Sequence, residues 1–157
     1  ATLSNGFYND CYYFDGLNDR IDVPKDDFEL PNGSPLTINM WINTDDATAG
    51  DPISAWEDTG GIQNESGFGL YYDNKWYMGN GSSWFSIDAE ILEDENWHMY
   101  SLIYDGSVMT SYRDGEQIAV SGSFTANYLI ELRLRIGDDN RGLSGREFKG
   151  YIDEDNI

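Results

Sequence analysis

The feature of this sequence that most restricts its fold is alternation of apolar and polar residues with a period of two. In residues 36–42 this alternation places Leu36, Ile38, Met40 and Ile42 on one face of an extended chain. The same period returns over residues 130–136. A helix would need apolar residues spaced three and four apart, whereas a period of two is that of a half-buried strand. The pattern therefore predicts strands with one face in a core.

Turn-forming residues divide the rest of the chain into short strands. Aromatic segments at 68–72, 75–78 and 84–87 are separated by Asp73-Asn74 and a Gly-Ser stretch, which predicts a meander. Residues 97–104, 108–113 and 116–120 predict three further strands joined by Gly-containing turns. For residues 89–96 a helical turn and a loop are equally compatible with the sequence. We expect an all-β, two-sheet antiparallel β-sandwich, a jelly roll of about a dozen strands.

The acidic charge limits the possible partners. Nine Lys and Arg residues oppose 29 Asp and Glu residues, so the formal net charge is −20. Such a field repels phosphate backbones, which argues against nucleic acid as a partner, and favours cations or neutral ligands. No stretch is long and apolar enough for a membrane span, so we expect no membrane insertion. We expect residues 1–157 to form one domain, part of a longer chain because the sequence stops inside a predicted strand at Ile157.

Residues 13–24 predict two short strands joined by an oxygen-rich turn, which we interpret as a hairpin. Asp15, Asn18, Asp19 and Asp22 lie within reach of one another in this segment. Carboxylate and amide oxygens are ligands that calcium takes in proteins. The turn is therefore either a calcium site or a solvated acidic loop.

Four landmarks, in order along the chain, resemble the laminin-G-like, concanavalin A-like jelly-roll family, which includes pentraxins and many carbohydrate-binding modules. They span nearly the whole sequence: residues 14–19, 36–42, 97–116 and 148–154. The resemblance implies that the first and last strands lie side by side. It also implies a structural calcium ion (Ca2+), common among such domains, with the candidate ligands Asp15, Asn18, Asp19, Asp153 and Glu154.

Aromatic residues gathered in the predicted meander are candidate ligand contacts. Sugars stack their apolar ring faces on such side chains, and Asp, Asn and Gln side chains bind the hydroxyl groups. Trp56, Trp76 and Trp84 are the three candidates. Because Trp76 shares a face with Met78, it suits either the core or a ligand site. Trp84 has serine residues on both sides in the sequence, so we expect it to be less enclosed. We predict that at least one of the three tryptophans contacts a ligand.

Glycosidases on the same fold carry three acids on one strand, because retaining hydrolysis needs two carboxylates about 5 Å apart. Asp88, Glu90 and Glu93 have a similar spacing, with the acid types exchanged at the first two positions. This segment precedes the Trp97 landmark in a predicted loop. We therefore expect no catalytic residues, and we expect that the protein is not an enzyme.

The family resemblance supports one main functional hypothesis. It is a non-catalytic, calcium-stabilised carbohydrate-binding or adhesion module of an extracellular or particle-surface protein, with a glycan or surface polysaccharide as partner. Neighbouring domains or subunits of the same assembly are further possible partners. One alternative is a structural, spacer or decoration domain of a fibre, filament or virion that makes only protein contacts. A third hypothesis, ranked below these two, is a glycoside hydrolase, which would need Asp88, Glu90 and Glu93 on one strand and pointing into one cleft.

Overall fold

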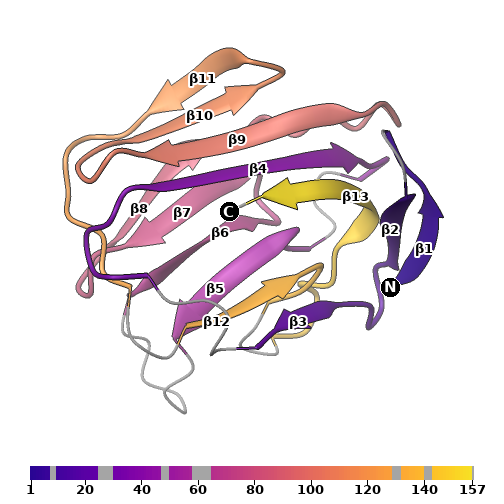
Figure 1. The fold of residues 1–157 in the computed structure, drawn as a ribbon, viewed down its shortest axis with the longest axis horizontal. Helices are drawn as coiled ribbons and strands as arrows, with labels where there is room; N and C mark the ends of the chain where they lie inside the picture. The colour runs from indigo at the N-terminus through magenta and orange to yellow at the C-terminus, as the bar shows by residue number, and fades with distance from the viewer. Residues whose placement is uncertain are drawn as a thin grey trace.

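The computed structural model describes residues 1–7, 10–24, 30–46, 50–57, 65–128, 132–139 and 143–156. These residues form two antiparallel sheets of seven and six strands, packed as the two layers of a sandwich (Figure 1). No helix occurs within the described ranges, and residues 89–96 form a loop. The all-β jelly-roll prediction is confirmed. Nothing among the described residues is a helix long and apolar enough to cross a membrane.

The seven-stranded sheet contains both ends of the described chain. Its strands, in spatial order, are β1 (Thr2–Asn5), β2 (Asp10–Asp15), β13 (Lys149–Asn156), β4 (Leu36–Asn43), β9 (His98–Tyr104), β10 (Met109–Arg113) and β11 (Glu116–Val120). Strand β13 lies between β2 and β4, with Tyr151 opposite Tyr13 on one side and Asn43 on the other. The first strand expected from the sequence, which begins at Tyr13 and forms part of β2, therefore pairs with the last strand as the resemblance implied, whereas β1, the first strand of the structure, pairs with β2 instead.

The six-stranded sheet contains the predicted meander. Its strands, in spatial order, are β3 (Ile21–Val23), β12 (Leu132–Ile136), β5 (Ile53–Glu57), β6 (Gly67–Tyr71), β7 (Lys75–Gly79) and β8 (Trp84–Asp88). Strands β6, β7 and β8 follow one another in sequence and in space. Their short connections leave no room for a crossover, which is why the local pattern was sufficient to predict them.

The prediction of a hairpin over residues 13–24 is wrong. Strand β2 belongs to the seven-stranded sheet, whereas β3 pairs with β12 in the other sheet. The connection between them begins at Gly16, whose φ of 75° lies in the left-handed region that glycine adopts without strain. Both strands carry apolar side chains that need a core, and the crossing places β2 between β1 and β13 in one sheet and β3 at the edge of the other.

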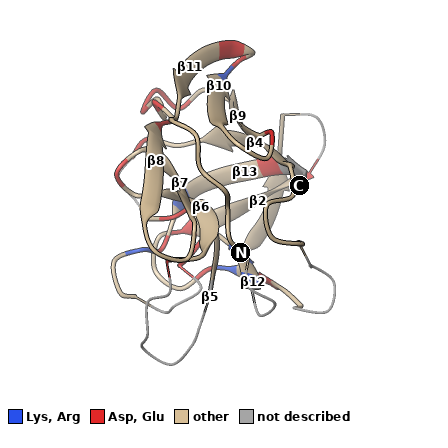
Figure 2. Cartoon of the chain, turned by 90° about the vertical axis from the view of Figure 1, so that its left-hand side faces the viewer, with Lys and Arg blue, Asp and Glu red and all other residues tan. Residues whose placement is uncertain are grey.

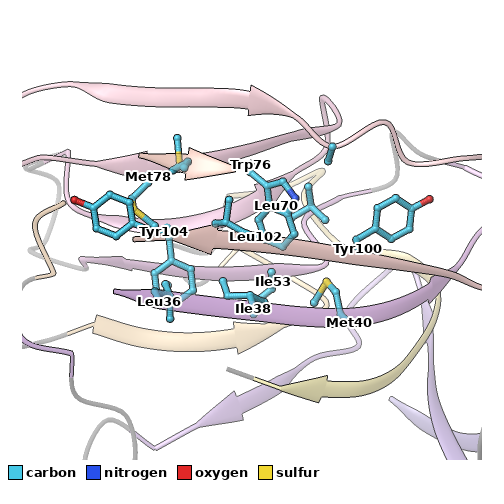
Figure 3. Close-up of a cluster of buried hydrophobic side chains, with 14 of the residues drawn as sticks. Leu36, Ile38, Met40, Ile53, Leu70, Trp76, Met78, Tyr100, Leu102 and Tyr104 are labelled. Atoms are coloured by element: carbon cyan, nitrogen blue, oxygen red, sulfur yellow. The ribbon is translucent and has the colours of Figure 1, made fainter. Parts of the chain in front are cut away.

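The core lies between the two sheets and follows the predicted alternation. Ile38 and Met40 on β4, with Leu102 on β9, face Leu70 and Trp76 from the six-stranded sheet (Figure 3). All five side chains have no exposed surface. Burying large apolar side chains in this way is the main stabilising term of such a fold.

An extended segment without strand pairing, residues 121–128, contributes further to the core. Phe124, Ala126 and Tyr128 are buried. The Tyr104 hydroxyl donates to the Phe124 carbonyl at 3.0 Å and accepts from the Ala126 N–H at 2.9 Å. A side chain thus supplies hydrogen bonds that a neighbouring strand would otherwise provide. No sequence pattern had indicated this segment as part of the core.

Candidate functional site

Aromatic side chains gather on the outer face of the six-stranded sheet. Phe68, Leu70, Trp76 and Met78 face the core, so the strand period turns their neighbours on β6 and β7 outward. We call the outward group the aromatic platform; its members are Trp56, Tyr71, Tyr72, Tyr77 and Trp84.

The platform rings support one another. The Trp56 ring lies 4.6 Å from the Trp84 ring in an edge-to-face arrangement and 5.1 Å from the Tyr71 ring. The Tyr71 and Tyr77 rings are 4.7 Å apart. Gly69 makes this possible, because a Cβ atom there would lie 2.8 Å from Cζ2 of Trp56. The indole therefore lies directly over the backbone of β6.

Polar groups border the platform on two sides. The Tyr77 hydroxyl donates to Asp73 Oδ2 at 2.8 Å. Partial burial and this hydrogen bond raise the pKa of Tyr77 to about 12, so the phenol stays protonated at neutral pH. On the other side, the Arg146 guanidinium lies 3.8 Å from the Tyr72 ring centre and 5.0 Å from that of Tyr71. Both distances are typical of cation–π contacts.

A buried acid holds the arginine in place. Arg146 Nη1 lies 3.6 Å from Oδ1 of Asp51, whose side chain is fully buried. The same Asp51 oxygen accepts the Tyr72 N–H at 3.0 Å, and the Asp51 N–H donates to the Arg146 carbonyl at 2.7 Å. Asp51 therefore ties the loop that carries Arg146 to the end of β6.

Platform and polar groups together enclose a shallow hollow of about 160 Å³. It is lined by Tyr71, Tyr72, Asp73, Tyr77, Trp84 and Arg146. The rings offer apolar faces, Asp73 offers a carboxylate acceptor and Arg146 offers guanidinium donors. This combination suits a ligand with an apolar face and hydroxyl groups at its edge, as a sugar ring has.

The three tryptophans predicted as ligand contacts take three different places. Trp84 lines the hollow. Trp56 is 1% exposed and stands behind Trp84 as a support. Trp76 is fully buried between the sheets, because it shares the inward face with Met78, and it has no surface to offer a ligand.

Asp73 and Arg146 were missed as site residues. The sequence around Asp73 indicated a turn, which it is, and gave no sign that the turn borders a hollow. Arg146 lies in an irregular loop more than 60 residues after Trp84, the last platform residue in the sequence. Only the fold brings it over Tyr72, so no local signal could have identified it.

Of the predicted calcium ligands, Asp15 ends β2, and Asn18 and Asp19 lie in the loop that follows. Asp15 Oδ1 accepts the Leu17 N–H at 2.9 Å, and Asp19 Oδ2 accepts the Asp15 N–H at 3.2 Å. The Ala1 amino group lies 2.6 Å from Asp19 Oδ1, and hydrogen bonding to it, against slight burial, lowers the pKa of Asp19. Asn18 is exposed.

Asp153 lies at the other end of β2. The register sets Asp15 opposite Lys149, so Asp153 is four residues further along β13, roughly 13 Å at the usual rise of a strand. Its carboxylate is buried and accepts the Phe7 N–H at 2.7 Å, which holds Phe7 against Trp41. The side chain of Glu154 lies outside the described residues. The fold therefore does not bring Asp153 to the loop acids.

Among the described residues, no three Asp, Glu, His or Cys side chains are grouped as a metal centre would require. A calcium ion needs six to eight oxygen ligands at about 2.3–2.6 Å. The carboxylates of the loop and of Asp153 instead accept backbone hydrogen bonds within the fold. Calcium binding thus stays a prediction from the family resemblance.

The three acids with glycosidase-like spacing do not share a strand. Asp88 ends β8, while Glu90 and Glu93 lie in the following loop. Glu90 has a φ of 53°, and its Oε2 accepts from Arg113 Nη1 at 3.0 Å. The chain leaves the strand between Asp88 and Glu90. The three carboxylates are therefore not aligned as they would be along one strand.

His98 occupies a different region, at the start of β9. Its Nδ1 lies 2.6 Å from Asp114 Oδ2, and its Nε2 lies 3.3 Å from Asp94. Burial lowers the pKa of His98, but the hydrogen bonds to Asp114 and Asp94 outweigh it, so the pKa is raised overall. The imidazole therefore clamps the loop before β9 to the turn after β10.

The two-sheet jelly roll defines the class of protein as a two-layer antiparallel β-sandwich domain. The chain belongs to the concanavalin A-like lectin/glucanases superfamily, whose family model matches residues 15–157. This match confirms the resemblance found in the sequence. None of the curated protein sequences compared with this chain matches it.

Solved structures show the same fold in proteins of low sequence identity. Domain 4 of AbnA, an extracellular GH43 arabinanase from Geobacillus stearothermophilus, was solved in complex with arabinotriose; its TM-score is 0.68 at 14% identity, covering 96% of this chain and 71% of that one. Domains LG4-5 of the mouse laminin alpha1 chain give a TM-score of 0.71 at 15% identity, covering 92% of this chain and 40% of that one. A SAP-like pentraxin from Limulus polyphemus gives 0.61 at 18% identity, covering 92% and 73%.

Proposed function

We propose that this domain is a non-catalytic carbohydrate-binding module of an extracellular or surface-exposed protein, and that it binds a neutral glycan in the hollow of the aromatic platform. The observation that carries the proposal is the lining of that hollow, where four aromatic rings meet one carboxylate and one guanidinium. The arabinotriose complex of a structural neighbour is in keeping with it.

Charge supports a neutral ligand. The formal net charge of −20 opposes the approach of an anionic sugar, and Figure 2 shows acidic segments on strands and loops alike. The positive group in the hollow, Arg146, lies beside the buried Asp51, which offsets its charge locally. Hydroxyl groups interact with both signs, since they donate to Asp73 and accept from Arg146.

The composition of the hollow also supports binding without hydrolysis. Asp73 is the one carboxylate among its described lining residues. Retaining and inverting glycosidases both need a pair of carboxyl groups flanking the bond to be cleaved. A single acid can accept a hydroxyl proton in a hydrogen bond, but it cannot supply both an acid and a nucleophile or base.

Binding can be measured by calorimetry with neutral oligosaccharides, including arabinotriose, and with the polysaccharides that contain them. Tyr72→Ala and Trp84→Ala should each weaken binding at least tenfold. Tyr12→Ala is the matched control, because Tyr12 is 44% exposed and Tyr72 is 41% exposed, and Tyr12 lies outside the platform. The control should bind as the unaltered protein does.

Two results would contradict the proposal. An equal loss of affinity in Tyr12→Ala would mean that the platform is not the binding face. No binding to any neutral glycan in the panel would favour the structural or spacer role, in which the domain contacts only protein. Release of reducing ends from a bound polysaccharide would contradict the non-catalytic part.

A further inference from the structure

A second aromatic hollow lies on the outer face of the seven-stranded sheet, on the opposite side of the sandwich from the platform. Its volume is about 380 Å³. It is lined by Tyr13, Asn43, Thr44, Asp45, Glu95, Lys149, Gly150 and Tyr151. These residues come from β2, β13, the end of β4 with the loop after it, and the loop before β9.

The strand register builds the floor of this hollow. Ile152 faces the core, so Lys149 and Tyr151 of β13 point to the outer face. Tyr151 is directly opposite Tyr13, and their rings are 4.8 Å apart. The Trp97 ring lies 6.2 Å from the Tyr151 ring and extends the aromatic surface. Tyr13, Tyr151 and Trp97 are half-buried, so each residue retains some accessible surface.

The rim of this hollow carries polar groups in fixed positions. Lys149 Nζ lies 2.9 Å from Asp45 Oδ1, and the Lys149 carbonyl accepts from the Thr44 hydroxyl at 2.8 Å. Asn43 Nδ2 donates to the Glu95 carbonyl at 2.8 Å, which holds the Glu95 loop beside the floor. The Lys149 ammonium group and the Asp45 carboxylate therefore border the rings of Tyr13 and Tyr151.

The same groups restrict the ligand class. A cationic ligand would compete with Lys149 for Asp45. An anionic ligand would approach a protein of net charge −20. A neutral, hydroxyl-rich ring meets neither obstacle, because it can stack on the tyrosines while its hydroxyls bond to the rim.

We propose that the hollow lined by Tyr13 and Tyr151 is a second site for neutral glycans. It does not depend on the platform, since the two sites share no residue and lie on opposite faces. One molecule with both sites filled would bind two glycan chains, one on each outer face of the sandwich. Such bivalent binding raises the overall affinity for a dense polysaccharide beyond that of either site.

Nuclear magnetic resonance titration of the intact domain tests the proposal, with arabinotriose, xylotriose and cellotriose as probes. We expect two separate groups of shifted signals, one around Tyr13 and Tyr151 and one around Tyr71 and Trp84. Tyr151→Ala should weaken binding at the first group at least tenfold and leave the second unchanged. Lys149→Gln, an exposed change, should weaken the same group, and Lys75→Gln on β7 serves as its control.

The outcomes separate the two proposals. Shifts confined to the platform would overturn the second site and leave the proposed function standing. Shifts confined to the Tyr13–Tyr151 hollow would support the second site and overturn the platform as the binding face. No shift with any of the three probes would overturn both. Unchanged binding at this hollow in both Tyr151→Ala and Lys149→Gln would also overturn the second site.

Discussion

Replacing Tyr104 by phenylalanine isolates the contribution of one buried hydroxyl to the stability of the fold. Tyr104 is fully buried, and its hydroxyl bonds to the Phe124 carbonyl and the Ala126 N–H. Both backbone groups belong to the segment 121–128, which has no strand partner of its own. The substitution keeps the ring and its packing, so it changes the hydrogen bonding alone.

The cost follows from the two groups that lose their partner. An unsatisfied buried polar group destabilises a protein by about 1–3 kcal/mol. Two such groups, with partial relaxation of the segment, should lower the free energy of unfolding by about 3 kcal/mol. In a domain of this size that loss lowers the melting temperature by roughly 6–12 °C.

Urea denaturation followed by circular dichroism would measure the change, with thermal melting as a second readout. Tyr12→Phe is the control, because Tyr12 is 44% exposed and surface substitutions of this kind stay within about 0.5 kcal/mol. A loss below about 1 kcal/mol in Tyr104→Phe would refute the reasoning. It would mean that the segment does not rely on this hydroxyl to satisfy its backbone.

Three further predictions concern the loop acids, the histidine and a glycine. If the loop after β2 binds calcium, calcium should raise the melting temperature over that in chelator, and Asp19→Ala should remove most of the difference; superimposable melts of the unaltered protein would contradict it. Because the folded-state pKa of His98 is raised, its stabilisation is complete below the unfolded pKa, about 6.5, and is lost as the pH rises through the folded pKa. The stability advantage over His98→Gln should therefore be larger at about pH 5.5 than at pH 9, and a constant difference would exclude the effect. Gly67→Ala should cost more than about 2 kcal/mol, because φ is 109° and the new Cβ would meet the Ala55 carbonyl, whereas Gly122→Ala, with open space around it, should be close to neutral.

Local pattern was enough for the elements whose neighbours in sequence are also neighbours in space. Strand β4 was predicted from its alternation, and the β6–β8 meander from its short turns. The alternation also placed Trp76 on the same face as Met78, and that face is the core. In these cases the information needed lies within a few residues, because the strand period fixes which side chains share a face.

Contacts between residues far apart in the sequence could not be predicted from it. Nothing within residues 13–24 tells that β2 and β3 pair with different sheets, since their pairing partners, β13 and β12, lie more than 100 residues away in sequence. Arg146 and Tyr72 are also far apart in the sequence, and only the fold brings them into contact. The strand register also separates Asp153 from Asp15, which the family resemblance had suggested as neighbours.

The contact between Trp56 and Gly69 has a consequence for the thermodynamics of ligand capture. An indole that lies on bare backbone and is held by Trp84 and Tyr71 has little rotational freedom left. Its side-chain entropy is lost when the chain folds, so the support behind Trp84 is already ordered when a ligand arrives. A ligand should therefore bind to a platform that is already rigid. The order of the platform side chains should change little with temperature, and binding should show no slow rearrangement step.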